Sequence, residues 1–101
     1  LRLIKHLSGG YAPYIKSMIN YEEKHLKDLL NHDLPLTLKS RSERLLKSLS
    51  PETNRVLLHL AQGGNPHQID TKKLEMLSKL GMIDDKHNLF SPILKKFLQQ
   101  Y

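Results

Sequence analysis

The chain has 101 residues, which is enough for one domain or for two small modules. It contains no cysteine, so disulfide frameworks, cysteine nucleophiles and cysteine metal ligands are excluded. The formal net charge of +6 favours polyanionic partners, and no apolar stretch approaches the ~20 residues that a membrane span needs. No signal peptide is recognisable, so we expect a cytoplasmic protein that does not bind membranes. Because the chain starts at Leu1 rather than methionine, we expect it to be a piece of a longer protein.

The first half of the chain has a helical repeat of apolar residues almost throughout. A first helix is expected to end at residues 9–10, because glycine readily adopts the left-handed conformation of a helix end. A second helix is expected over residues 12–30, with a proline in its first turn. Residues 34–38 are interpreted as a linker. A third helix follows, with Ser40 or Ser42 as its N-cap.

The second half has sharper helix boundaries. Ser50 and Pro51 form an N-cap and a first-turn proline, and they start a helix whose apolar stripe covers residues 56–61. Asp70 is the expected cap of the next helix. The inward face of that helix is expected to carry Leu74, Leu77 and Leu80.

The apolar pattern changes period over residues 82–90, which predicts two very short strands around a polar turn. Ser91 then starts a last helix. The order helix, turn, helix, hairpin, helix is that of a winged helix-turn-helix. We therefore predict a mainly α fold, with a small helical lid or connector over residues 1–49 and a winged-helix domain with a short β-hairpin over residues 50–101.

The stretches LSPETNRVLLHLAQGG, LEMLSKLGMI and NLFSPILKKFL follow one another in the second half. Together they resemble the C-terminal winged-helix segment of bacterial and archaeal P-loop ATPases of the AAA-like, STAND type. In that family a Leu-Gly-apolar step leads into the wing and an aromatic-Ser-Pro step leads out of it. Here these steps are residues 80–83 and 90–92. The resemblance implies a lid and winged-helix end, with the ATPase domain upstream in the same protein.

The stretch HLSGGYAPYIK adds to this resemblance. It is similar to the family's Gly-Gly-x-Pro turn beside the nucleotide, although two residues rather than one separate Gly10 from Pro13. The resemblance implies that Gly9, Gly10 and Pro13 bind the cofactor of the parent protein, ATP or ADP. The chain has no Gly-x-x-x-x-Gly-Lys-Ser/Thr motif, so we expect no cofactor in this chain alone and no ATP hydrolysis by it.

The helix after Asp70 is a candidate recognition helix for DNA. Its lysines would neutralise phosphates, its short hydroxyl side chains would approach base edges, and the tip of the wing would add contacts. The residues expected to bind nucleic acid are Thr71, Lys72, Lys73, Ser78, Lys79, Lys86, His87 and Asn88. The basic excess is not concentrated there, however, because residues 51–101 carry seven basic against five acidic residues and residues 1–50 carry nine against five.

Three functions remain open. The chain is the regulatory or DNA-binding end of a P-loop ATPase, a protein-interaction module that uses the same helix, or a stand-alone DNA-binding regulator. The expected partners are double-stranded DNA and the upstream ATPase domain. Neither an enzyme nor a metal protein is expected, because neighbouring carboxylates such as Asp84-Asp85 are not opposed across a cleft and no zinc-type ligand spacing occurs.

Overall fold

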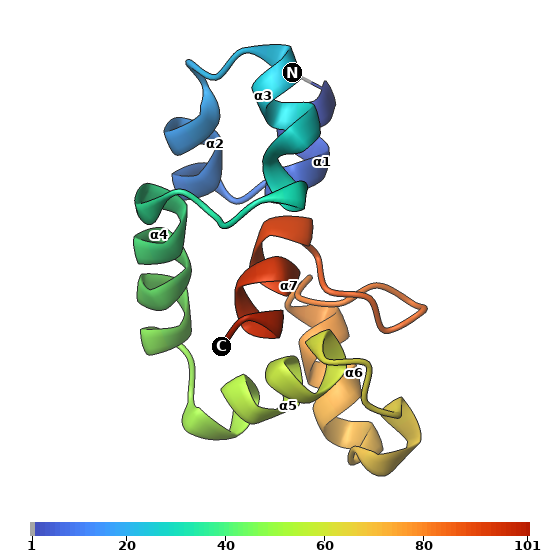
Figure 1. The fold of residues 1–101 in the computed structure, drawn as a ribbon. Helices are drawn as coiled ribbons and strands as arrows, with labels where there is room; N and C mark the ends of the chain where they lie inside the picture. Colours follow the sequence, from blue (N-terminus) through green and yellow to red (C-terminus); the bar gives the residue numbers. More distant parts are fainter. Residues whose placement is uncertain (1) are drawn as a thin grey trace.

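The computed structural model describes residues 2–101 and is mainly helical, as the sequence predicts. The molecule is elongated, 40 × 23 × 22 Å (Figure 1). Within residues 2–101 no helix is long and apolar enough to cross a membrane. The helices in this part of the chain are α1 (Arg2–Ser8), α2 (Ala12–Met18), α3 (Glu23–Asp28), the 3₁₀-helix η1 (Leu29–Asn31), α4 (Leu36–Lys47), α5 (Pro51–Ala61), the 3₁₀-helix η2 (Pro66–Gln68), α6 (Thr71–Lys79) and α7 (Pro92–Gln99).

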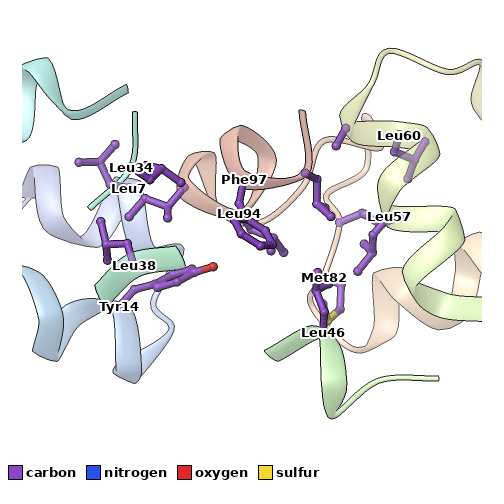
Figure 2. Close-up of a cluster of buried hydrophobic side chains, with 14 of the residues drawn as sticks. Leu7, Tyr14, Leu34, Leu38, Leu46, Leu57, Leu60, Met82, Leu94 and Phe97 are labelled. Atoms are coloured by element: carbon purple, nitrogen blue, oxygen red, sulfur yellow. The ribbon is translucent and has the colours of Figure 1, made fainter. Parts of the chain in front are cut away.

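Helix α7 lies between the two halves of the chain and packs against both (Figure 1). It contacts α1, η1 and α4 from the first half and α5 from the second. Its buried residues form two adjacent rows at a spacing of four, so one broad face of this short helix is apolar. They are Ile93, Leu94, Phe97 and Leu98, as predicted. Figure 2 shows Leu94 and Phe97 between Leu7 and Leu38 on one side and Leu57 on the other.

The start of α7 is tied to the end of α1 by two adjacent contacts. The Ser91 hydroxyl donates a hydrogen bond to the carbonyl O of Leu7 at 2.7 Å and caps α7 by accepting one from the backbone N of Leu94 at 3.3 Å. A Cβ added at Gly9 would overlap the carbonyl O of Phe90. Only glycine fits there, and its φ of +61° is in the left-handed region. The division into residues 1–49 and 50–101 stays a prediction, and the two parts share one hydrophobic core.

The prediction of one helix over residues 12–30 is wrong. The chain leaves the helix after Met18, which leaves Ile19 58% exposed, and α3 then turns back onto α1. A continuous helix of this length would run straight for about 28 Å, so its last turns could not return to α1 as α3 does. The break instead allows Leu26 and Leu29 to join the same core as Met18.

Helix α4 begins at Leu36, earlier than the serine caps predict, so the expected linker contributes its first turn. Ser42 lies inside the helix and is fully buried. Its hydroxyl donates to the carbonyl O of Leu38 at 2.9 Å, so it accepts from the Tyr14 hydroxyl at 2.6 Å. Burial raises the pKa of Tyr14 to about 12. Ser42 therefore links α4 to α2 instead of capping a helix.

The caps predicted in the second half are confirmed. Ser50 accepts a hydrogen bond from the backbone N of Thr53 at 3.1 Å, and Asp70 accepts one from the backbone N of Lys72 at 3.0 Å. These side chains satisfy N–H groups that have no partner inside the helix. The buried residues of α5 are those of the predicted stripe, Val56, Leu57, Leu60 and Ala61.

The two strands of the predicted β-hairpin do not form within the described residues. One antiparallel bridge, between Ile83 and Leu89, is all that remains of the hairpin there. Asp84 organises the turn instead, because its Oδ1 accepts from the backbone N atoms of Lys86 and Asn88, both at 2.9 Å. The bridge is held by two backbone hydrogen bonds of 2.9 Å, from Phe90 N to the carbonyl O of Met82 and from Asp84 N to that of Asn88. After Phe90 the chain leaves to cap α7.

The prediction that Leu80 faces the core is wrong, because it is 62% exposed. Leu77 is fully buried and Leu74 half-buried, as expected for the inner side of α6. Gly81, at φ +74°, ends the helix and reverses the chain. Met82 therefore takes the core position, and its backbone N donates to the carbonyl O of Leu77 at 3.0 Å.

Alanine at Gly9 should destabilise the protein far more than alanine at its neighbour Gly10. Gly9→Ala is expected to lower the free energy of unfolding by about 3 kcal/mol, because it combines backbone strain with overlap onto Phe90. Gly10 also has a positive φ, of +85°, but open space surrounds its Cβ position, so Gly10→Ala should cost only about 1 kcal/mol. Urea denaturation followed by circular dichroism measures both losses. Equal losses would contradict the close packing at Gly9.

Candidate functional site

Helix α6 lies at one end of the molecule with one side open (Figure 1). Its inner side is fixed by the buried Leu77. The predicted nucleic-acid residues on this helix that are exposed are Thr71, Lys72, Ser78 and Lys79. They share one helix, but a helix has several sides, and Ser78 lies on the side of Thr71 rather than beside the two lysines.

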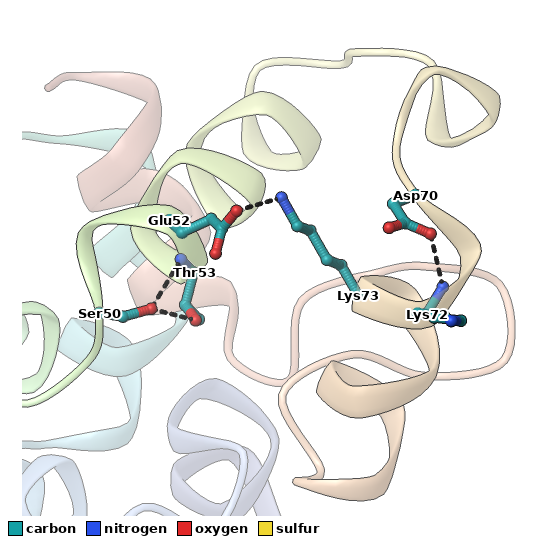
Figure 3. A network of polar contacts seen from close by, with 6 residues as sticks. All are labelled: Ser50, Glu52, Thr53, Asp70, Lys72 and Lys73. Atoms are coloured by element: carbon teal, nitrogen blue, oxygen red, sulfur yellow. Dashed lines mark hydrogen bonds and ion pairs between the residues drawn. The ribbon is translucent and has the colours of Figure 1, made fainter.

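Lys73 is half-buried and paired, unlike the other predicted residues of α6. Its Nζ lies 2.5 Å from Glu52 Oε1 in the first turn of α5 (Figure 3). The hydrogen bond from Lys73 is the main reason why the pKa of Glu52 lies below its ordinary value. Lys73 therefore joins α6 to α5, and its charge is already balanced within the chain.

The open side of α6 carries charges of both signs. Lys72 and Lys79 are seven residues apart, two turns along the same side. Glu75 lies between them, three residues after the first and four before the second, where its carboxylate neighbours both ammonium groups. Asp70 adds further negative charge at the start of α6, whereas the charge of Glu52 is balanced by Lys73. This surface is close to neutral, unlike the chain as a whole.

Two large apolar side chains are exposed beside these charges. Met76 is 45% exposed and Leu80 is 62% exposed, and they lie one turn apart. A hollow of about 210 Å³ between α5 and α6 has Met76, Val56 and Leu77 in its lining. Sequence reasoning missed this pair because it assigned Leu80 to the core. The signal that could have found the pair is the spacing of four residues between Met76 and Leu80, because Met76 lies outside the apolar stripe of Leu74 and Leu77.

The predicted wing residues belong to the turn that Asp84 organises. His87 adopts a left-handed conformation, φ +65°, and its backbone N donates to the carbonyl O of Asp84 at 3.0 Å. Lys86 is exposed. Asn88 lines a groove with residues of α1 and α7, and no hydrogen bond or ion pair joins residues 86–88 to α6 in the part of the chain that the structure describes.

The residues implied at the cofactor occupy the turn between α1 and α2. Gly9 and Gly10 end α1, both at positive φ, and Pro13 lies in the first turn of α2. Gly9 also makes the close contact with Phe90 that joins the two halves. The packing of the chain therefore requires Gly9, whatever it binds. A nucleotide contact at these residues stays a prediction.

No metal centre is evident in residues 2–101, where no three histidine, aspartate or glutamate side chains gather closely enough to hold an ion. Comparisons with protein-family models, with curated proteins and with solved structures found no match. The resemblance to P-loop ATPases therefore stays a prediction, and the geometry of the exposed surfaces carries the functional argument.

The turn at Asp84 should respond to acid. The hydrogen bond from the backbone of Asn88 is the main reason why the pKa of Asp84 is held below its ordinary 3.8. The hydrogen-bonded carboxylate therefore stabilises the turn fully only well above pH 3.8, and this stabilisation is lost as the pH falls through the lower pKa of the folded state. We expect the amide signals of Lys86 and Asn88 to titrate with a midpoint below 3.8 in nuclear magnetic resonance spectra.

Asp84→Asn is the matched control, because an amide oxygen still accepts the two backbone hydrogen bonds. The turn should persist in this variant and the titration of both amide signals should disappear. A midpoint at or above 3.8 in the unmodified protein would contradict the hydrogen bonding described for Asp84.

Proposed function

We propose that this chain is a non-catalytic docking module that binds a protein surface through helix α6. The observation that carries the proposal is the pair Met76 and Leu80, which are exposed one turn apart on a helix that projects at one end of the molecule. An apolar centre with charges of both signs around it is the usual composition of a protein–protein contact. Lys72, Glu75 and Lys79 supply that rim.

The energetics also favour this assignment. Covering the exposed parts of Met76 and Leu80 would contribute about 2–3 kcal/mol. The hollow beside Met76 could receive a side chain of the partner, which is how central residues of interfaces gain most of their energy. The ion pair of Lys73 with Glu52 holds α5 and α6 together, so the surface is formed before the partner arrives.

The proposed setting is the C-terminal end of a P-loop ATPase in the cytoplasm, with the chain docking onto the ATPase domain of its own protein. The support is the resemblance of residues 80–83 and 90–92 to the steps that flank the wing in that family. The proposed fold type is a winged helix-turn-helix with a reduced wing. Helices α5 and α6, the turn η2 between them and the bridge after α6 follow the order of that motif.

DNA binding is the second candidate function. It is favoured by the exposed Thr71 and Lys72 in the first turn of α6, where a recognition helix makes base and phosphate contacts, and by the net charge of +6. Lys79 and Lys86 would add phosphate contacts. The local balance of charge weighs against it, because Glu75 separates the two lysines of this helix.

A photo-crosslinking amino acid at position 76 tests the proposal in the full-length protein in its own cells. We expect it to join the tryptic peptide of residues 74–79 to a peptide of the ATPase domain, as read by mass spectrometry. Leu80→Ser in the same protein should lower the yield about five-fold, because it removes the other half of the apolar contact.

The double substitution Lys72→Ser and Lys79→Ser is the control for charge, and it should lower the yield less than Leu80→Ser does. In this variant the yield is read on the tryptic peptide that ends at Lys86, because trypsin no longer cleaves after position 79. Crosslinking to DNA that requires Lys72 and Lys79 but tolerates Leu80→Ser would reject docking and support the DNA-binding function. The absence of any crosslink at position 76 would reject both uses of α6.

A further inference from the structure

A groove of about 710 Å³ lies on the outer side of α7, and no residue of α6 lines it within the described chain. It runs between α1 and η1 on one side and the loop before α7 on the other. Its apolar lining comes from η1, the loop and the first turn of α7, and consists of Leu30, Leu89, Phe90 and Pro92. The volume is in the range of specific binding sites.

Two lysines border the apolar lining. Lys95 and Lys96 of α7 line the groove together with His6 of α1. Neither lysine makes an ion pair within residues 2–101. The acidic lining residue is Asp84, whose carboxylate already accepts hydrogen bonds from the turn that it organises. With two lysines against the one carboxylate of Asp84, the lining keeps an excess of positive charge.

The groove continues across α7. Lys95 and Gln99 also line a second hollow, of about 410 Å³, against the end of α5. Gln99 is fixed there, because its Nε2 donates to the carbonyl O of Ala61 at 3.1 Å. A surface that extends across a whole helix fits a stretch of polypeptide better than a compact small molecule.

We propose that this groove binds an acidic peptide segment of a protein partner, with apolar side chains placed between its carboxylates. The carboxylates would meet Lys95 and Lys96, and the apolar side chains would cover Leu30 and Leu89. A nucleic acid is less suited to the groove, because phosphates cannot cover apolar side chains. The aromatic ring in the lining, Phe90, is half-buried and already contacts Tyr11. This inference does not depend on the proposed role of α6.

The test uses a short synthetic peptide of alternating aspartate and leucine, titrated into the isotope-labelled chain at low salt. Nuclear magnetic resonance spectra detect weak binding and report the folded state of every variant at once. We expect shifts at His6, Leu89, Lys95 and Lys96. The same peptide with serine in place of leucine should bind at least about five-fold more weakly, because it cannot cover the apolar lining.

The double substitution Lys95→Ser and Lys96→Ser should weaken binding of the aspartate–leucine peptide about five-fold through the loss of two ion pairs. The matched control is Lys16→Ser with Lys24→Ser, which removes the same charge from α2 and α3 and should change the affinity less than about two-fold. Equal weakening by the two pairs, or shifts that spare the groove, would overturn the proposal. A short DNA duplex that gives the same shifts at lower concentration would also overturn it and assign the groove to nucleic acid.

Discussion

Burial of helix α7 between the two halves of the chain is the interaction on which the rest of the structure depends. An eight-residue helix has little stability of its own, so α7 exists because both of its apolar rows are covered. Leu94 is fully buried in a core that includes side chains from α1, α2, α4 and α5. Removing either half would uncover part of the apolar face of α7.

The start of α7 fixes how the halves meet. Ser91 caps the helix and bonds to the end of α1 with the same hydroxyl. Gly9 has no side chain, so Phe90, the residue before Ser91, can approach the end of α1 closely. These contacts also explain why the strands of the predicted wing do not form. The chain has to return from the Ile83–Leu89 bridge to the cap at Ser91 at once, which leaves no length for paired strands.

The same arrangement separates two exposed surfaces with different chemistry. On α6 the apolar pair Met76 and Leu80 is surrounded by balanced charges, whereas the outer side of α7 combines apolar lining with Lys95 and Lys96. The surface of α6 suits a partner that carries charges of both signs, and the groove on α7 suits an acidic partner. The two proposals for binding therefore rest on separate residues and can fail separately.

Local signals were readable from the sequence and tertiary ones were not. Caps such as Ser50 and Asp70 and the positive-φ Gly81 depend on neighbours within a few residues, so they were predicted correctly. The broken second helix, the buried Ser42 and the exposed Leu80 depend on partners that only the assembled core supplies. The groove on α7 was missed for the same reason, because Lys95 and His6 line one groove only after α1 and α7 pack together.

Amide hydrogen exchange of the intact chain, with and without Leu94→Ala, tests the shared core most directly. This truncation of a fully buried side chain should remove about 2–5 kcal/mol of stability. If α7 joins the halves into one cooperative unit, the most protected amides of α4 and of α5 should lose that protection together and by the same free energy. Loss of protection in one of these helices while the other keeps its full value would contradict a core shared through α7.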